Sequence, residues 1–238
     1  MTRLIRLIGW LLAAMAAAAA PVVERRAVIN HDAVVGFPET VPAGAISQLY
    51  LKFKPWLRVY TGCVAFPAVN ARGDTSGGLA PTGSHNSGCS SSRGQVYARQ
   101  GTHGGRRAIM YAWYMPKDSP STGLGHRHDW ESAVVWLDGT STDATVLGVA
   151  ASAHGSFNTR AARDVSFSGT RPRLGYRSHW PTNHQMVFTG DQGGEQPLIA
   201  YEELTEGARR ALDETDFGSA NVPFNQWNFA NNLAKAAL

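Results

Sequence analysis

Hydrophobic residues recur every three to four positions in three segments of the chain, as they do on one face of a helix. These segments are residues 45–54, 202–215 and 225–237. In the first of them the apolar face consists of Ile46, Leu49, Tyr50 and Phe53. The spacing therefore predicts one short helix near the beginning of the chain and two near its end.

Other segments are apolar at nearly every position, which is typical of buried strands. The clearest are residues 108–115, 132–137 and 146–153, each of which stops at a proline or at turn residues. Residues 57–66 and 185–189 are further strand candidates. Continuously apolar strands are buried on both faces, as in a sandwich covered by other elements.

Two long segments lack either pattern. Residues 72–94 are rich in Gly, Ser, Thr and Asn, and residues 155–178 are rich in Gly, Arg and Ser, so both are expected to be irregular. No internal repeat and no linker between domains is visible. The chain is thus expected to form a β-rich (α+β) fold, a single-domain β-sandwich with helices at its periphery.

The N-terminus has the pattern of a secretory signal peptide, which we place at residues 1–19. Arg3 and Arg6 precede an apolar stretch that ends in small residues. This stretch is shorter than the ~20 residues that a membrane-spanning helix needs, and a retained membrane anchor is the alternative. We therefore predict cleavage before Ala20, a secreted protein, and one domain over residues 20–238.

The charge of the chain argues against a nucleic-acid partner. The formal net charge is +4, and two of the arginines belong to the predicted leader. The remaining basic residues are scattered along the sequence, whereas nucleic-acid binding requires a concentrated basic surface.

The chain has two cysteines, Cys63 and Cys89. In a secreted protein an even number of cysteines favours a disulfide, and closing a loop of this size contributes roughly 3 kcal/mol to stability. Two free thiols are the alternative. A catalytic thiol is disfavoured, because pairing would consume it.

Residues 125–131 read Gly-His-Arg-His-Asp-Trp-Glu and come immediately before an apolar strand. Neighbouring carboxylates repel one another and lose hydration when they are packed together, and a divalent cation is the simplest way to neutralise them. On a regular strand, His126 and His128 would point away from Asp129 and Glu131. We therefore expect a bent loop, with strand alternation beginning at Glu131.

The residue types favour a hard cation. Carboxylates with one or two histidines suit Mg²⁺, Ca²⁺ or Mn²⁺ better than a structural zinc site, which uses thiolates. Asp118 precedes His126 by one turn rich in Ser, Pro and Gly, which could fold its carboxylate back to the same point. The alternative is a solvated loop of charged residues joined by salt bridges.

The run AIMYAWYMPKDSPSTGLGHRHDWE at residues 108–131 resembles the signature region of the necrosis- and ethylene-inducing-like protein (NLP) family. The hallmark of that family is the heptapeptide GHRHDWE, which is complete here, whereas Met115 stands where an aromatic residue is common. The resemblance extends from residues 29–32 through residues 149–155 to residues 216–232, and so spans nearly the whole predicted mature chain.

The resemblance implies a β-sandwich flanked by helices, similar to actinoporins and some fungal lectins. It also implies that a divalent cation, Mg²⁺ or Ca²⁺, occupies a negatively charged cavity. The residues that match its cation cluster are Asp118, His126, Asp129 and Glu131. Further residues assigned to the cavity are His184, Trp180 and His128, of which His128 is expected to orient the segment rather than to bind the ion. Cys63 and Cys89 match the class with one disulfide.

The implied function is toxicity to dicotyledonous plants, without enzymatic activity. As a monomer, the protein would bind the sugar head group of glycosyl inositol phosphoryl ceramide sphingolipids at the plasma membrane and then disrupt that membrane, with Trp180 entering the headgroup layer. Without the resemblance, Trp180 would be interpreted as a core residue, which is also what we expect of Trp136 and Trp227. Two rival functions are a metal-dependent hydrolase and a non-cytotoxic relative that binds glycans or acts only as an immune elicitor.

Overall fold

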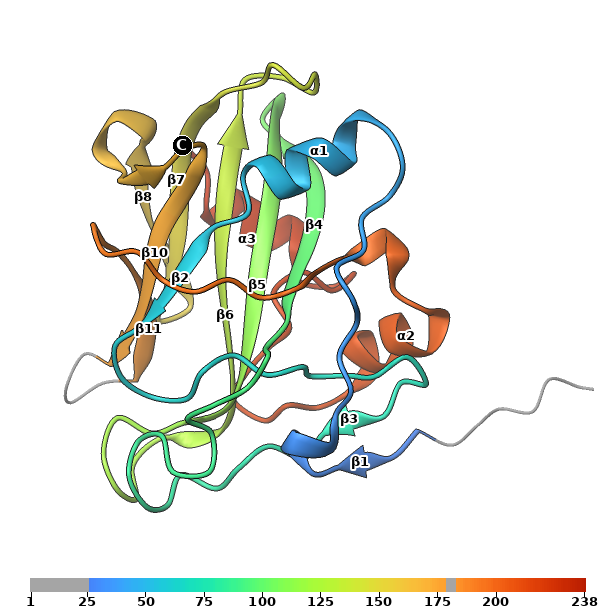
Figure 1. Ribbon diagram of the computed structural model, residues 1–238, viewed down its shortest axis with the longest axis vertical. Coiled ribbons are helices and arrows are strands. Elements are labelled where there is room, and N and C mark those ends of the chain that lie inside the picture. Colours follow the sequence, from blue (N-terminus) through green and yellow to red (C-terminus); the bar gives the residue numbers. More distant parts are fainter. Residues whose placement is uncertain (1–25, 179–182) are drawn as a thin grey trace, which may run out of the picture.

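The structure, a computed structural model, describes residues 26–178 and 183–238. The predicted leader and Trp180 lie outside the described residues. Within them, most strands belong to two sheets that pack against each other, and the helices lie at the edges and over the outer face (Figure 1). A continuous hydrophobic core fills the space between these layers. The predicted β-rich sandwich with peripheral helices is confirmed.

The larger sheet has six strands in the order β12-β4-β5-β6-β7-β8 within the described residues. Its strands are β4 (Val96–His103), β5 (Arg106–Asp118), β6 (His126–Leu137), β7 (Val146–Ala153), β8 (Ser156–Ala161) and β12 (Leu198–Ala200). The central strands β5 and β6 pair antiparallel and are buried along most of their length. This confirms the strands predicted at 108–115, 132–137 and 146–153. Burial on both faces is confirmed for the first two, whereas β7 is buried on both faces only at residues 148–151.

The smaller sheet has the order β11-β10-β2 and packs over β6 and β7 through β11. Its strands are β2 (Trp56–Val59), β10 (Arg171–Ser178) and β11 (His184–Phe188), with β9 (Phe167–Ser168) paired to β10. A separate two-stranded pair joins β1 (Val28–Ile29) to β3 (Thr75–Ser76). The strand predicted at 185–189 is thus confirmed as β11.

The helices predicted from spacing are present and somewhat shorter than expected. They are α1 (Ala45–Lys52), α2 (Glu206–Glu214) and α3 (Phe229–Lys235), with 3-10 turns at His31–Ala33, Ala162–Asp164 and Tyr201–Glu203. Helix α2 begins after Thr205, whose hydroxyl accepts a hydrogen bond from the backbone N–H of Ala208 and so caps the helix. No helix in the described residues is long and apolar enough to cross a membrane.

Several sequence expectations were wrong. The strand expected at 57–66 ends at Val59, because the chain turns at Gly62 (φ 85°) to bring Cys63 into the core. Residues 155–178 are not irregular but contain β8 and β10, and β4 was not anticipated. Trp227, expected in the core, is 71% exposed, whereas Trp136 is buried as predicted.

The predicted disulfide between Cys63 and Cys89 is present, and both cysteines are buried. It anchors the loop at 72–94, which further hydrogen bonds hold in place. The backbone N–H of Gly62 donates to Nδ1 of His85, and the buried ammonium of Lys117 donates to backbone carbonyls of the same loop. The loop is therefore fixed against the end of β5, where the charged residues lie.

Candidate functional site

The heptapeptide is a strand and not the expected bent loop. β6 begins at His126 and pairs with β5, but the register shifts at Lys117, which lies opposite both Arg127 and His128. His128 adopts the left-handed conformation, with φ 62°. This distortion interrupts the alternation of side chains, which was the reason for expecting a loop. Residues on both sides of it can therefore contribute to one site.

Gly125 closes the hairpin just before β6. Its φ of 103° suits glycine, and a Cβ atom there would lie 2.1 Å from the backbone oxygen of Asp118. The close backbone approach brings the end of β5 beside the beginning of β6, where Asp118 pairs with His126.

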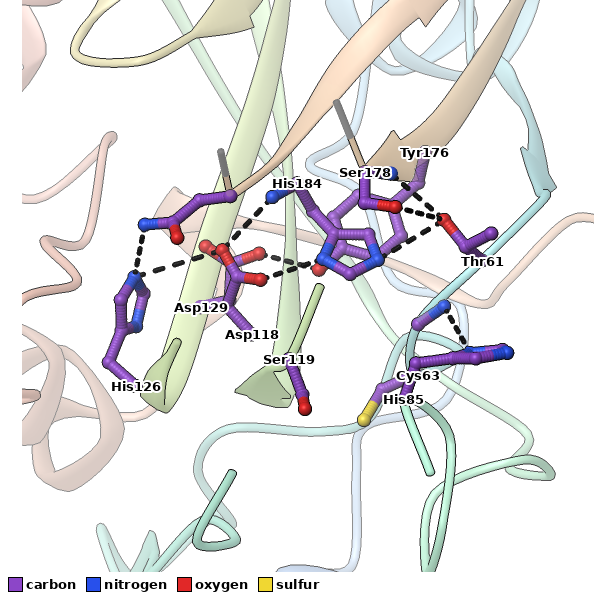
Figure 2. Close-up of polar contacts among 12 residues, drawn as sticks. Thr61, Cys63, His85, Asp118, Ser119, His126, Asp129, Tyr176, Ser178 and His184 are labelled. Carbon is purple, nitrogen blue, oxygen red and sulfur yellow. Dashed lines mark hydrogen bonds and ion pairs between the residues drawn. The ribbon is translucent and has the colours of Figure 1, made fainter. Parts of the chain in front are cut away.

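The carboxylate of Asp118 is fully enclosed and is held by the other sheet. Nδ1 of His184 donates to Oδ1 over 2.7 Å, and the backbone N–H of His184 donates to Oδ2 over 3.1 Å. Nε2 of the same ring lies 3.2 Å from the hydroxyl of Thr61. Figure 2 shows the imidazole of His184 between the Asp118 carboxylate and Thr61. Both ends of this ring are therefore fixed.

His126 lies on the other side of the Asp118 carboxylate (Figure 2). Its Nε2 is 3.8 Å from Oδ2 of Asp118 and accepts a hydrogen bond from the Asn183 amide at 3.1 Å. Its Nδ1 donates to the backbone carbonyl of His128 over 2.7 Å. Nε2 of His126 therefore lies between the Asn183 amide and the Asp118 carboxylate.

Two more carboxylates lie along the same strand. Asp129 accepts a hydrogen bond from the Tyr176 hydroxyl at 2.7 Å, and Glu131 accepts one from the Ser152 hydroxyl. Burial raises the pKa of Asp129 to about 8, and the neighbouring charge of Asp118 adds to this effect. Burial and the charge of Asp129 also raise the pKa of Glu131 well above its ordinary value. Ionising these carboxylates together is therefore unfavourable.

These groups line a cavity of about 560 Å³. Asp118, His126, Asp129, Glu131 and His184 form its acidic part, and the rest of the wall is mostly small polar residues and asparagines. Lys235 lies at the cavity, and its ammonium donates to the backbone carbonyl of Gly155. The cavity thus combines three buried carboxyl groups with many neutral hydrogen-bonding groups, which suits a polyhydroxylated or cationic ligand.

The predicted cation remains a prediction. Across residues 26–178 and 183–238, no three His, Cys, Asp or Glu side chains are arranged so that they could hold a metal ion. The donor types nevertheless fit a hard cation, since buried carboxylates with raised pKa values are what a cation would stabilise. Mg²⁺ in particular is usually held by one or two carboxylates and completes its shell with water.

His128 does not line the cavity to which it was assigned. Its Nδ1 lies 2.7 Å from the Tyr114 hydroxyl, and its ring packs edge-on against Phe217. Burial, followed by the charge of Arg127, lowers the pKa of His128 to about 4. The reason for its position is the distortion of β6, which directs this side chain into the packing beneath the strand. Trp180 falls outside the described residues.

Four residues of the site were not predicted from the sequence, namely Thr61, Ser152, Tyr176 and Asn183. A signal for Tyr176 was present, because arginines alternate with Leu174 and Tyr176 as on a half-exposed strand. Thr61, Ser152 and Asn183 are common polar residues without a pattern of their own, and only the fold brings them to the site.

Comparison with known proteins decides the family. The family model described as "Necrosis inducing protein (NPP1)" matches residues 47–236. The chain belongs to this family. A necrosis-inducing protein from Phytophthora nicotianae is 44% identical over 93% of the chain and 96% of the relative. NLP effector protein 10 from Phytophthora capsici is 45% identical over 92% of the chain and 96% of the relative.

Solved NLP structures share the fold. NLPPya in complex with mannosamine is 49% identical, covers 89% of this chain and 100% of its own, and superposes with a TM-score of 0.85. The non-toxic HaNLP3 protein is 42% identical over 87% of this chain and 98% of its own, with a TM-score of 0.82. The family therefore includes a non-toxic member with this fold, so membership alone does not establish toxicity.

Proposed function

We propose that this NLP is a secreted, non-enzymatic cytolysin that binds the sugar head groups of plant plasma-membrane sphingolipids and damages the membrane. The observation that carries the proposal is the acidic cavity, in which Asp118, Asp129 and Glu131 are buried together. Such a concentration of carboxylates costs free energy unless a positively charged ligand offsets it.

Asp118, His126, Asp129 and Glu131 would hold Mg²⁺ or Ca²⁺. When bound, such a cation supplies coordination positions for neighbouring sugar hydroxyls. The protein itself positions the carboxylates and the imidazole that would bind the cation. His184 and Tyr176 fix two of the carboxylates, while Asn183 and the other amides of the cavity can bind further hydroxyls.

The relatives support a sugar ligand. NLPPya has been solved in complex with mannosamine and with glucosamine. Both amino sugars combine hydroxyls with an ammonium group at neutral pH, and the cavity described above would attract both kinds of group. A sphingolipid head group that ends in a sugar presents the same chemistry at a membrane surface.

Dicot leaf infiltration with the full mature chain tests the proposal. Asp118→Asn removes a predicted cation ligand while retaining its shape, and Asp164→Asn at an exposed position is the matched control. Necrosis is expected from the wild type and the control, and none from Asp118→Asn, with all three proteins folded by circular dichroism. Absence of necrosis with the wild type, or equal necrosis with Asp118→Asn, would contradict the proposal.

A non-toxic glycan-binding protein is the second candidate, and the likeness to HaNLP3 favours keeping it. It predicts that the wild type binds sphingolipid vesicles without releasing an entrapped dye and without causing necrosis. The hydrolase alternative predicts something else, namely free sugar or phosphate released from purified lipid. Dye leakage with intact lipid, assayed by mass spectrometry, would support the cytolysin.

A further inference from the structure

A second cavity lies beside the acidic one, between the outer strands of the two sheets. β8 ends the larger sheet and β11 ends the smaller one, and both strands lie on the same side of the molecule (Figure 1). Their side chains and Arg177 of β10 enclose a groove of about 430 Å³. Its polar lining comes mainly from Asn158, Thr159, Arg160, Arg177 and Gln185.

The two arginines of this groove have no carboxylate partner in the described part of the chain. The Arg160 guanidinium stacks on the ring of Phe188 at 4.5 Å, and that of Arg177 lies 5.7 Å from the Tyr60 ring. Arg171 on the same sheet differs, since it forms an ion pair with Glu195 at 2.7 Å. The groove therefore holds positive charge that nothing in the described residues neutralises.

Gln185 provides a second indication of a ligand. Its side chain lines the groove and is only 9% exposed, and its amide has no hydrogen-bond partner among the described residues. A ligand that accepts a hydrogen bond from this amide would form a contact that no described residue provides. Two guanidinium groups and an amide donor form a set that suits an anion.

The groove and the acidic cavity share two strands. Ser156 and Phe157 line the cavity, and the next residues of β8 line the groove. On β11, His184 lines the cavity and the residues from Gln185 onward line the groove. A ligand that occupies both would carry a neutral or cationic sugar at one end and an anion at the other.

We propose that the groove binds the phosphodiester of a glycolipid head group whose sugar occupies the acidic cavity. The sugar half of this inference rests on the proposed function. A guanidinium group can donate two parallel hydrogen bonds to phosphate oxygens. The two arginines would therefore bind an anionic head group and not a neutral lipid. The arginines of the groove also offset the repulsion between the phosphodiester and the carboxylates of the acidic cavity.

Vesicle sedimentation tests the groove separately from the sugar. The probes are phosphatidylcholine vesicles with and without phosphatidylinositol, in the presence of a chelator so that no cation bridges protein and lipid. The test variant is Arg160→Gln with Arg177→Gln. The charge-matched control is Arg106→Gln with Arg163→Gln, at exposed positions outside the groove.

We expect the wild type and the control to prefer the phosphatidylinositol vesicles, and the test variant to bind them about tenfold more weakly. Equal losses in both double variants would overturn the proposal, because they would indicate a non-specific effect of net charge. No preference in the wild type would overturn it as well. Asp118→Asn should retain this preference even if it loses sugar binding, so a failure of the proposed function and a failure of the groove give different results.

Discussion

Nδ1 of His184 donates to Oδ1 of Asp118 over 2.7 Å and thereby joins the beginning of β11 to the end of β5. Both side chains are almost completely buried, at 0% and 1% exposure. We predict that His184→Ala lowers the free energy of unfolding by about 3 kcal/mol, because a buried carboxylate is left without its partner. Urea denaturation measures this.

His103→Ala, at an exposed position, is the control for that experiment and should change the free energy by less than about 0.5 kcal/mol. If His184→Ala were as stable as the control, the contact would not hold the two sheets together.

Two neighbouring glycines allow the tight hairpin to be tested. Gly123 (φ 80°) and Gly125 (φ 103°) both have left-handed backbones, but a Cβ atom meets nothing within 4 Å at Gly123 and the Asp118 backbone at Gly125. Gly123→Ala should therefore cost about 1 kcal/mol, from backbone strain alone. Gly125→Ala should cost at least about 2 kcal/mol, and equal losses in chemical denaturation would refute the close approach.

The raised pKa of Asp129 makes the stability of the cation-free protein depend on pH. From about pH 4 to about pH 8 the folded protein retains a proton that the unfolded chain has lost, so the contribution of Asp129 to stability falls as the pH rises. Asp129→Asn should remove that contribution and give a flatter profile than the wild type on the alkaline side of this range. Denaturation in chelator at several pH values measures the difference, and parallel profiles would be the contrary result.

His128 acts in the opposite direction. Its pKa of about 4 lies below the unfolded value of 6.5, so the unfolded chain binds the extra proton between these values and stability is lost as the pH falls from 6.5 to 4. His128→Asn retains a residue that tolerates φ 62° and removes the titrating ring. The variant should lose about 1 to 3 kcal/mol less than the wild type over this range. An unchanged loss would mean that His128 is not buried in its neutral form.

The sequence predicted those parts of the fold whose strands are apolar at every position, namely most of β5, β6 and β7. It did not predict β4, whose second half is polar, or β10, in which arginines alternate with apolar residues. The charge cluster at 125–131 was identified, but a loop was expected there because side chains on a regular strand point alternately to opposite faces. The local distortion is the left-handed backbone conformation of His128, which the residue types do not predict.

The site itself could be predicted only in part. Asp118, Asp129 and Glu131 are close in the sequence, and their density already indicated a divalent cation. Tyr176 and His184 come from the other sheet, and His184 was inferred from the family resemblance and not from the residues around it. Contacts between sheets depend on packing over the whole core, which local patterns do not encode.

The division of the site between two sheets has a consequence for how it responds to proteolysis. Residues 108–131 carry all four predicted cation ligands, but the groups that hold two of them, Tyr176 and His184, come from the other sheet. A protease that separated the hairpin from β10 and β11 would leave the heptapeptide intact and abolish the cavity. Loss of binding during degradation should therefore precede loss of the heptapeptide itself.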